Sequence, residues 1–306
     1  MTIDAIILVA KCTMTPLAII GVLANLTVII VFINCKIHTR SFAYTLVLQQ
    51  AVIDMLGCCC YAVFSCVNGN KSSIACKTGV TIFYFILFAS AYNLVLISIE
   101  RYIAVVHPLK YWARGTQKKR LLPRLCIPFV SSLLTVCYVP IFVDVNEMGE
   151  CFVENRRILI SSSVLMSILG GVLPILIMLF CYRRVYVTLC EQSRTRTELT
   201  TKGSITQSGV ESPTDAKQLR NEAERNFTTT MLINTVIYVI FDFLSMLIHI
   251  AAAGRSDDLR YYVIFSVLLL CNMVANPFVY AYKFTDYKKG FCKTFCCRDQ
   301  TTVMEV

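Results

Sequence analysis

Ionisable residues lie inside or at the end of several long apolar stretches of the sequence. Asp54 and Asp242 stand within such stretches, and Arg101 closes another as part of Glu100-Arg101-Tyr102. A charged side chain is costly inside a membrane, so we expect each acid to be neutral, paired or bound to an ion. The chemistry that these residues predict is therefore ion pairing, hydrogen bonding or cation binding between helices.

Arg101 shares one helical face with Ser90 and Phe83, which precede it by 11 and 18 residues. At 3.6 residues per turn, the three side chains fall within about 20° of one another. One face of this helix thus joins an apolar position, a hydroxyl and a guanidinium along its length.

The sequence offers no arrangement that is typical of covalent catalysis. No nucleophile–base pair, phosphate-binding loop or metal-ligating triad stands out beyond the apolar stretches. Cys58-Cys59-Cys60 lacks His or acidic companions at zinc spacing, which favours membrane packing over metal binding. We therefore predict that the protein is not an enzyme.

The composition predicts an all-α membrane protein. Hydrophobic residues make up 56% of the 306 residues and charged residues 16%, a balance too apolar for one water-soluble core. Seven stretches satisfy the requirement of about 20 apolar residues for a membrane-spanning helix. We expect these helices at residues 6–33, 42–66, 76–106, 121–143, 158–190, 227–253 and 260–282.

The distribution of basic residues predicts the orientation. If successive helices cross the membrane in alternate directions, 22 of the 29 Lys and Arg residues fall on one side and seven on the side of the N-terminus. Because basic loops stay in the cytosol, we expect the N-terminus outside and the C-terminus inside. The net charge of +10 then reflects topology and anionic lipid, and it gives no support for nucleic-acid binding.

The connections between the predicted helices are short, except for a polar inner loop at Glu191–Glu222 that we expect to be mobile. No soluble domain fits between the helices, so a ligand must reach the bundle and its outer loops directly. No internal repeat is visible, which argues against the inverted-repeat architecture of many transporters.

Six short motifs follow one another at matching depths in the predicted helices. They are Gly21-Val-Leu-Ala-Asn25; Ala51-Val-Ile-Asp54; Cys76; Glu100-Arg101-Tyr102-Ile-Ala-Val-Val-His-Pro108-Leu109; Pro174 followed by Tyr182; and Asn276-Pro277-Phe-Val-Tyr280. With seven helices and this order of motifs, the chain resembles the rhodopsin-like (class A) G protein-coupled receptors from about residue 21 to 297. The resemblance implies a seven-transmembrane receptor domain over residues 1–297, with an interfacial helix at 284–297, and a cytoplasmic tail at 298–306.

The resemblance also implies an activation switch at the cytosolic ends of the helices. Glu100 would neutralise Arg101, and Glu224 would form a second, interhelical pair; the alternative for Glu224 is an ordinary solvated charge. Pro174 and Pro277 each remove a backbone hydrogen bond, so both helices should bend. The residues implied in coupling and switching are Glu100, Arg101, Tyr102, Pro108, Tyr182, Glu224, Asn276, Pro277 and Tyr280.

A polar cluster around Asp54 is implied by the same resemblance. In the family such a cluster holds a sodium ion, for which oxygen ligands are suited; the alternative is a polar network that joins helices. Met273 stands where family members commonly carry a hydroxyl, which weakens the case for sodium. The implied members are Asn25, Asp54, Ser90, Asn272 and Asn276. No other cofactor is expected.

The family implies a disulfide between Cys76 and Cys151, which would tie the third helix to the second outer loop. Cys12 and Cys66 also stand near the outer ends of their helices, so a second bridge between them stays open. The remaining cysteines lie mostly in apolar stretches, where Cys behaves as a small hydrophobic residue.

The segment after the seventh helix alternates aromatic and basic residues, which favours a helix lying in the membrane interface. Cys296 and Cys297 then resemble palmitoylation sites, with unmodified cysteine as the alternative. Asn70 begins a glycosylation sequon in the first outer loop.

The sequence constrains the ligand less than the class of protein. Phe83 stands at the helix-three position where aminergic receptors carry an Asp, so a monoamine would lack its usual counter-ion. The outer pocket that the family fold implies consists of Phe83, Tyr84, Leu87, Phe152, His249, Tyr262 and Ser266. Acidic residues of the outer loops would attract a cationic peptide, although interspersed basic residues reduce their field. These acids are Asp144, Glu147, Glu150, Glu154, Asp257 and Asp258.

The sixth helix departs from the family pattern. It reads Tyr238-Val-Ile-Phe-Asp242-Phe-Leu-Ser in place of Cys-Trp-x-Pro, and it has no proline between Phe227 and Ala253. Asp242 or Phe243 therefore takes the place of the usual Trp, and Asp242 should face the bundle. We interpret the chain as a divergent or orphan-like member with altered activation.

The favoured hypothesis is a multi-pass plasma-membrane receptor that converts binding of an extracellular ligand, preferably a peptide, into heterotrimeric G protein activation. Arrestin and receptor kinases are further expected partners, and lipid surrounds the bundle. Within the class, a small non-amine or lipid ligand is the alternative. From other classes, a transporter or ion carrier that uses Asp54 and Asp242, or a heptahelical partner without G protein output, stays open.

Overall fold

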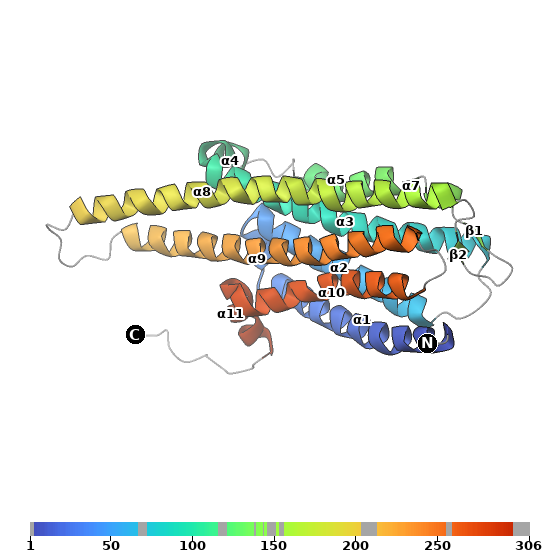
Figure 1. The fold of residues 1–306 in the computed structure, drawn as a ribbon. Helices are drawn as coiled ribbons and strands as arrows, with labels where there is room; N and C mark the ends of the chain where they lie inside the picture. Colours follow the sequence, from blue (N-terminus) through green and yellow to red (C-terminus); the bar gives the residue numbers. More distant parts are fainter. Residues whose placement is uncertain are drawn as a thin grey trace.

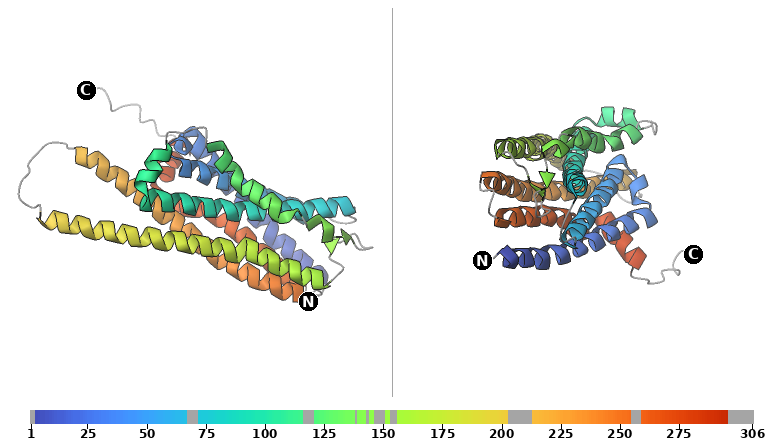
Figure 2. Two further views of the ribbon diagram at one scale, coloured as in Figure 1. Left: turned by 90° about the horizontal axis from the view of Figure 1, so that it is seen from above. Right: turned by 90° about the vertical axis from the view of Figure 1, so that its right-hand side faces the viewer.

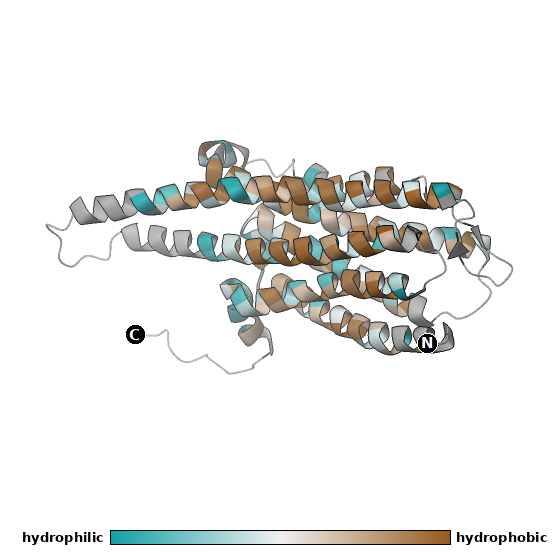
Figure 3. Cartoon of the chain, viewed as in Figure 1, coloured by the Kyte–Doolittle hydropathy of each residue, from teal (hydrophilic) through white to brown (hydrophobic). Residues whose placement is uncertain are grey.

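The chain folds into a bundle of long helices that run side by side (Figure 1). The computed structural model describes residues 3–66, 72–115, 121–137, 139–142, 144–145, 151–152, 156–202, 213–254 and 259–295. Within these ranges, seven helical segments are long and apolar enough to cross a membrane. Apolar residues dominate the middle of the long helices (Figure 3), as expected where helix surfaces face lipid.

The first half of the chain forms α1 to α6. These elements are α1 (Ile3–Asn34), the 3-10 turn η1 (Ile37–Thr39), α2 (Phe42–Cys66), α3 (Ser73–Val106), α4 (Pro108–Gly115), α5 (Leu121–Val136) and α6 (Val139–Phe142). Lys36 joins α1 to η1 in a left-handed backbone conformation, with φ at 51°. The Ser72 side chain accepts a hydrogen bond from the backbone N–H of Ala75 at 3.2 Å and so caps the start of α3.

The second half begins with a short antiparallel strand pair and continues as helices. The elements are β1 (Asp144–Val145), β2 (Cys151–Phe152), α7 (Arg156–Ser167), the π-helical turn η3 (Ile168–Val172), α8 (Leu173–Lys202), α9 (Pro213–Gly254), α10 (Leu259–Lys283) and α11 (Thr285–Phe295). The strand register pairs Asp144 with Phe152 and Val145 with Cys151. α7, η3 and most of α8 together make the fifth membrane-spanning segment.

α3 lies at the centre of the bundle, where it contacts α2, α5, α8 and α9, while α1 packs against α2 and α10. The N-terminus and the β1–β2 pair lie at one end of the bundle, and α4 and α11 lie at the other (Figure 1, Figure 2). We call these the N-terminal end and the Arg101 end, because Arg101 lies near the end of α3 that leads into α4.

Gly21 lets α1 approach both α2 and α10. A methyl group at this position would meet the Sγ atom of Cys58 and would lie 2.8 Å from Cγ2 of Val274. The close approach helps to bury a core cluster toward the N-terminal half of the bundle, which includes Ala18 and Leu270. Tight packing through small residues is a common way to associate helices in membranes.

All seven predicted spans coincide with helices, and α2 has the predicted bounds. α8 and α9 extend beyond the predicted 158–190 and 227–253 into the segment predicted as a mobile loop. That loop prediction is wrong for 191–202 and 213–222, where the helices continue through polar segments that include good helix formers such as Glu, Gln, Lys and Arg. Residues 203–212 lie outside the described residues.

The fourth predicted helix, 121–143, is interrupted. α5 ends at Val136 and α6 begins at Val139. Pro140 lacks the N–H that a continuous helix would donate to the carbonyl of Val136, so the chain turns near Cys137. Neither α4 nor the β1–β2 pair was predicted from the sequence.

Candidate functional site

Arg101 is buried near the end of α3, with 5% of its surface exposed. Its guanidinium carbon lies 4.7 Å from the centre of the Phe227 ring on α9. Its Nε atom has no hydrogen-bond partner among the described residues. Because an aromatic face attracts a guanidinium electrostatically, Phe227 holds the charge between α3 and α9.

The Phe227 ring connects Arg101 to the end of α10. It meets Tyr44 edge-on, with 4.7 Å between ring centres. Its centre lies 5.4 Å from the centre of the Phe284 ring. Phe284 in turn lies 6.5 Å from the fully buried ring of Tyr280. An aromatic cluster with members from α2, α9 and α10 thus adjoins the arginine.

The other residues predicted for the switch lie at the same end of the bundle. Buried among them are Glu100, Tyr182, Asn276 and Pro277. Tyr102 is partly buried, and its hydroxyl lies 3.1 Å from Nε2 of His107, whereas Pro108 is exposed as the first residue of α4. The Glu224 side chain lies outside the described part of the structure, so its pair with Arg101 stays a prediction.

Pro277 leaves the carbonyl of Met273 without its helical donor, and a side chain of α1 takes that donor's place. Nδ2 of Asn25 donates to Met273 O at 3.3 Å and also to Gly21 O at 2.9 Å. The expected contact of Asn25 with Asp54 is therefore replaced by contacts with the backbone. Asn25 joins α1 to α10 where the proline interrupts the helical hydrogen bonds.

Pro174 leaves the carbonyl of Gly170 without its helical donor in the same way. The hydroxyl of Tyr238 on α9 donates to Gly170 O at 2.8 Å, and the hydroxyl of Tyr92 on α3 donates to the neighbouring Leu169 O at 3.4 Å. Both carbonyls belong to the π-helical turn η3, a kind of turn that is frequent at functional sites. Two tyrosines from neighbouring helices thus hold this turn.

Asp54 is fully buried, and donors from three helices meet its carboxylate. Gln50 Nε2 and Ser90 Oγ donate to Oδ1, each at 2.9 Å, and Asn276 Nδ2 donates to Oδ2 at 2.7 Å. The structure therefore brings Ser90 and Asn276 to the acid, as the sequence analysis expected.

Gln50 completes this network, and the sequence analysis missed it. Its Nε2 atom also lies 2.6 Å from Ser90 Oγ, and its Oε1 atom accepts from Asn93 Nδ2 at 2.9 Å. The signal that points to it is its spacing, because a residue four positions before Asp54 lies on the same helical face. Gln50 joins α2 to α3 through amide, hydroxyl and carboxylate groups.

These contacts fit a hydrogen-bonded network better than a sodium site. Hard cations need oxygen lone pairs, whereas the described partners of the Asp54 oxygens are N–H and O–H donors. Met273 supplies no hydroxyl, whereas the buried side-chain oxygen of Asn272 meets no described partner and leaves a lone pair for a cation. Sodium binding at Asp54 stays a prediction.

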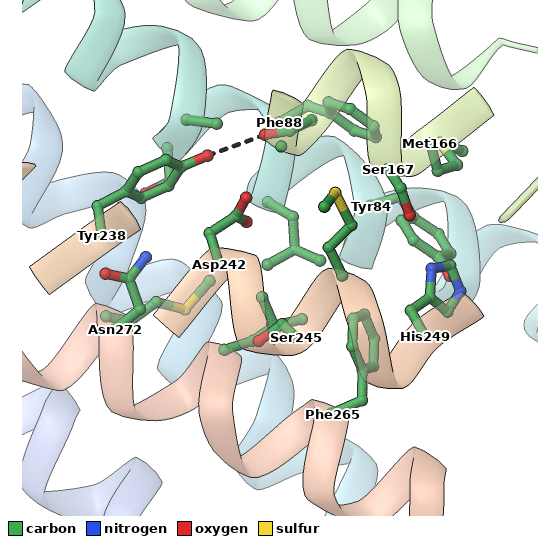
Figure 4. A pocket seen from close by; sticks show the side chains of 18 residues that line it. Tyr84, Phe88, Met166, Ser167, Tyr238, Asp242, Ser245, His249, Phe265 and Asn272 are labelled. Carbon is green, nitrogen blue, oxygen red and sulfur yellow. Dashed lines mark hydrogen bonds between the residues drawn. The ribbon is translucent and has the colours of Figure 1, made fainter. Parts of the chain in front are cut away.

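A cavity lies between α3, α7, η3, α9 and α10 (Figure 4). Part of this cavity is open to solvent. Much of its wall is apolar, with Phe88, Met246 and Leu269 among the lining residues. Ser90 also lines it, so the cavity adjoins the network around Asp54.

Three residues predicted to contact ligand line this cavity: Tyr84, Leu87 and His249. The Tyr84 hydroxyl lies 3.3 Å from Nε2 of His249, whose ring stacks on Phe265 with 4.7 Å between centres. Asp242, which we expected to face the bundle, lines the same cavity from α9. The cavity therefore combines aromatic walls with an acid.

The other predicted ligand residues do not line this cavity or are not described. Phe83 packs against Tyr61 of α2, with 5.2 Å between ring centres, so the apolar end of the Arg101 face contacts protein there. Neither Phe83 nor Ser266 is among the described residues that line the cavity. Phe152 and Tyr262 have side chains outside the described part of the structure.

Cys76 is buried near the start of α3 and is disulfide-bonded. The side chain of its expected partner, Cys151, lies outside the described part of the chain, so this pairing stays a prediction. Cys12 is a free, exposed thiol. The alternative of a bridge between Cys12 and Cys66 is therefore wrong.

α11 follows α10 and packs against α1. Tyr287 and Gly290 are buried, whereas Phe291 and Phe295 are exposed. Its bounds lie within the predicted 284–297, and exposed aromatic residues suit a helix in the membrane interface. The predicted modification sites Asn70, Cys296 and Cys297 lie outside the described residues.

Comparison with known proteins identifies relatives. Residues 24–280 match the family model described as 7 transmembrane receptor (rhodopsin family). The chain is 24% identical to the histamine H2 receptor of Cavia porcellus over 95% of the chain and 81% of that receptor. It is 29% identical to the D(2) dopamine receptor A of Xenopus laevis over 62% of the chain and 43% of the relative. It is 30% identical to the alpha-1A adrenergic receptor of Canis lupus familiaris, over 58% and 61% respectively.

Proposed function

Since the chain belongs to the rhodopsin family of seven-transmembrane receptors, we propose that it converts binding of an extracellular ligand into activation of a heterotrimeric G protein. Its N-terminal end faces the outside of the plasma membrane, and its Arg101 end faces the cytosol. The excess of Lys and Arg in the loops at the Arg101 end supports this orientation. The protein acts by changing shape and carries out no covalent chemistry.

The contact between Arg101 and Phe227 carries the proposal. It places a buried cation of α3 under an aromatic side chain of α9, 4.7 Å away. When α9 moves away from α3, the guanidinium loses this cover and becomes accessible to a protein that binds at the cytosolic end. A contact worth about 1 kcal/mol suits a two-state switch, because a ligand can outweigh it by binding one state more tightly.

The character of the cavity supports the proposal that the ligand is a small molecule. Its largely apolar and aromatic walls, with a few polar groups, suit a small molecule rather than a long peptide. The names of the similar receptors refer to histamine, dopamine and adrenergic ligands, which are small amines. The peptide hypothesis depends on acids of the outer loops whose side chains lie outside the described residues, and it stays the alternative.

Nucleotide exchange tests the proposed function. The full chain, with an epitope tag at its N-terminus, would be expressed in cells together with G proteins of each major class. Surface staining of intact cells reports the orientation, and GTPγS binding to the membranes reports exchange, without ligand and with a panel of small amines. We expect exchange above that of receptor-free membranes, and its loss in Arg101→Ala at equal surface expression.

Arg183→Ala is the matched control, because Arg183 is an exposed arginine of α8 near the same end of the bundle and should not affect exchange. Exchange that persists in Arg101→Ala would contradict the switch. If no G protein responds at verified surface expression, the receptor hypothesis fails. Measurement of substrate-coupled current would then examine the transporter alternative.

A further inference from the structure

Asp242 carries a carboxylate oxygen that no described residue satisfies. Its Oδ2 atom is buried and has no hydrogen-bond partner in the described part of the molecule. Figure 4 shows the carboxyl group directed away from the α9 backbone into the space that Ser167 and Phe88 also border. An unpaired buried acceptor is costly in any protein, and more so in a membrane-spanning helix.

The fold leaves room for this carboxyl group. A methyl group at Gly171 of η3 would lie 2.8 Å from Asp242 Oδ2, so the absence of a side chain there lets the acid approach the turn. Tyr238, one turn away on α9, uses its hydroxyl on Gly170 O at 2.8 Å. This neighbouring hydroxyl is therefore already engaged as a donor.

Some of the other polar groups that border the cavity already have a hydrogen-bond partner, and others do not. Ser245 donates to the Phe241 carbonyl of its own helix at 2.7 Å, and His249 lies 3.3 Å from the Tyr84 hydroxyl. Ser167 Oγ is buried and has no hydrogen-bond partner among the described residues. Three unsatisfied oxygens, from Asp242, Ser167 and Asn272, thus border one cavity with aromatic walls, and the carboxylate is the one that pairs with a cation by charge.

We propose that Asp242 is the counter-ion for a small ligand that carries one protonated amine on an aromatic body. The ammonium group donates to Asp242 and to Ser167, and the aromatic body packs against Leu87, Met246 and Phe265. This inference rests on the proposed function and names its ligand class. In this chain the acid thus stands on the sixth membrane-spanning helix, α9. At the helix-three position where aminergic receptors carry an Asp, Phe83 packs against Tyr61.

An ammonium group fits this site better than a neutral hydroxyl group. A carboxylate accepts hydrogen bonds and gains most from a charged donor, and the described lining residues of the cavity include no Lys or Arg. Aromatic and apolar walls lower the local dielectric constant and so strengthen the pairing. Selectivity for an amine over an alcohol of the same shape therefore measures the role of Asp242.

Ligand binding to the purified full chain in lipid nanodiscs tests this proposal without a G protein. The probes are phenethylamine and tryptamine, each compared with its neutral counterpart, 2-phenylethanol and tryptophol. We expect at least one amine to raise the melting temperature in a concentration-dependent manner, and to bind at least tenfold more tightly than its alcohol. Asp242→Asn should remove this preference, with at least a tenfold loss of amine affinity.

Asp286→Asn is the matched control, because Asp286 is an acid at the opposite end that pairs with Arg40 at 3.0 Å. It should bind the amine as the unmodified chain does. Gly171→Ala provides a second variant if Asp242→Asn does not fold, since its methyl group displaces the carboxyl group and should weaken amine binding severalfold.

Three results would overturn the proposal: equal binding of amine and alcohol, full amine affinity in a folded Asp242→Asn protein, or no binding of either amine at millimolar concentration. Failure here is separable from failure of the proposed function. Amine binding that depends on Asp242 but gives no nucleotide exchange would refute only the coupling, whereas exchange lost in Arg101→Ala without any amine binding would refute only the amine site.

Discussion

The guanidinium carbon of Arg101 lies 4.7 Å from the centre of the Phe227 ring, so an aromatic side chain of α9 covers the buried cation of α3. From the sequence alone we expect acidic partners, Glu100 and Glu224, for this arginine. An aromatic cover differs from an ion pair because it attracts the cation without neutralising it. The packing of α9 against α3 therefore depends on this aromatic contact as well as on charge.

Phe227→Ala should raise nucleotide exchange in the absence of ligand. Loss of a cation–π contact of about 0.5–1 kcal/mol shifts a two-state equilibrium roughly two- to fivefold. GTPγS binding per surface receptor measures the effect. Phe278→Ala is the control, because Phe278 is an exposed residue of α10; unchanged exchange in Phe227→Ala would show that the ring does not hold the closed state.

Gln50→Leu should destabilise the bundle and make its stability depend on sodium. The variant loses two donor contacts, to Asp54 and to Ser90, at a cost of roughly 1–3 kcal/mol. A sodium ion can then bind the Asp54 carboxylate in place of the lost hydrogen bond. Melting temperatures in sodium and in N-methylglucamine buffers should agree for the unmodified protein and differ by several degrees for the variant.

Gln49→Leu is the matched control for that measurement. The amide of Gln49 donates to the Leu125 carbonyl of α5 at 2.9 Å, so the variant loses a partly buried hydrogen bond without touching Asp54. Its melting temperature should fall without a sodium dependence. The prediction fails if sodium raises the melting temperature of the unmodified protein as much as that of Gln50→Leu. That result would show that Gln50 and the ion bind at the same time.

Tyr238→Phe should lower stability more than Tyr92→Phe. Both variants remove a hydroxyl that donates to a carbonyl of η3, at 2.8 Å for Tyr238 and at 3.4 Å for Tyr92. The shorter bond should contribute about 1 kcal/mol, and the longer one less. Thermal unfolding in detergent gives the comparison, and an equal or larger loss in Tyr92→Phe would refute this ranking.

Gly21→Ala should destabilise the contact of α1 with α2 and α10 by roughly 1–3 kcal/mol. The added methyl group would meet Cys58 Sγ and would lie 2.8 Å from Val274 Cγ2, which belongs to a stiff β-branched side chain. Thermal unfolding should show the loss. The double variant Gly21→Ala, Cys58→Ala should recover part of it, and an unchanged melting temperature in the single variant would argue against close packing here.

The membrane spans could be predicted because the lipid environment leaves a strong signal in composition. A run of about 20 apolar residues has few alternatives to a helix. The extensions of α8 to Lys202 and of α9 back to Pro213 left no such signal, because beyond the apolar part helix formation depends on weak propensities. The break near Cys137 depended on a single proline, Pro140.

The site was predicted less completely than the fold. The contact of Asp54 with Asn276 followed from motifs and the contact with Ser90 from its similar depth in the third helix, whereas the contact with Gln50 depends on which side of α2 faces α3. Phe227 could not be recognised as a partner of Arg101, because an aromatic residue at the edge of an apolar run has the same pattern whether it packs on lipid or on a cation. Only the packing of helices distinguishes these cases.

The continuity of α9 has a mechanical consequence. This helix runs from Pro213 to Gly254 with no proline after its first residue, and Asp242 and Phe227 stand 15 residues apart on it, or roughly 22 Å at 1.5 Å per residue. A continuous helix of this kind tilts or rotates as one rigid body, so both ends move together. A helix with a hinge bends instead, and its two halves move relative to each other. A displacement of α9 at Asp242 therefore also displaces the Phe227 ring that covers Arg101.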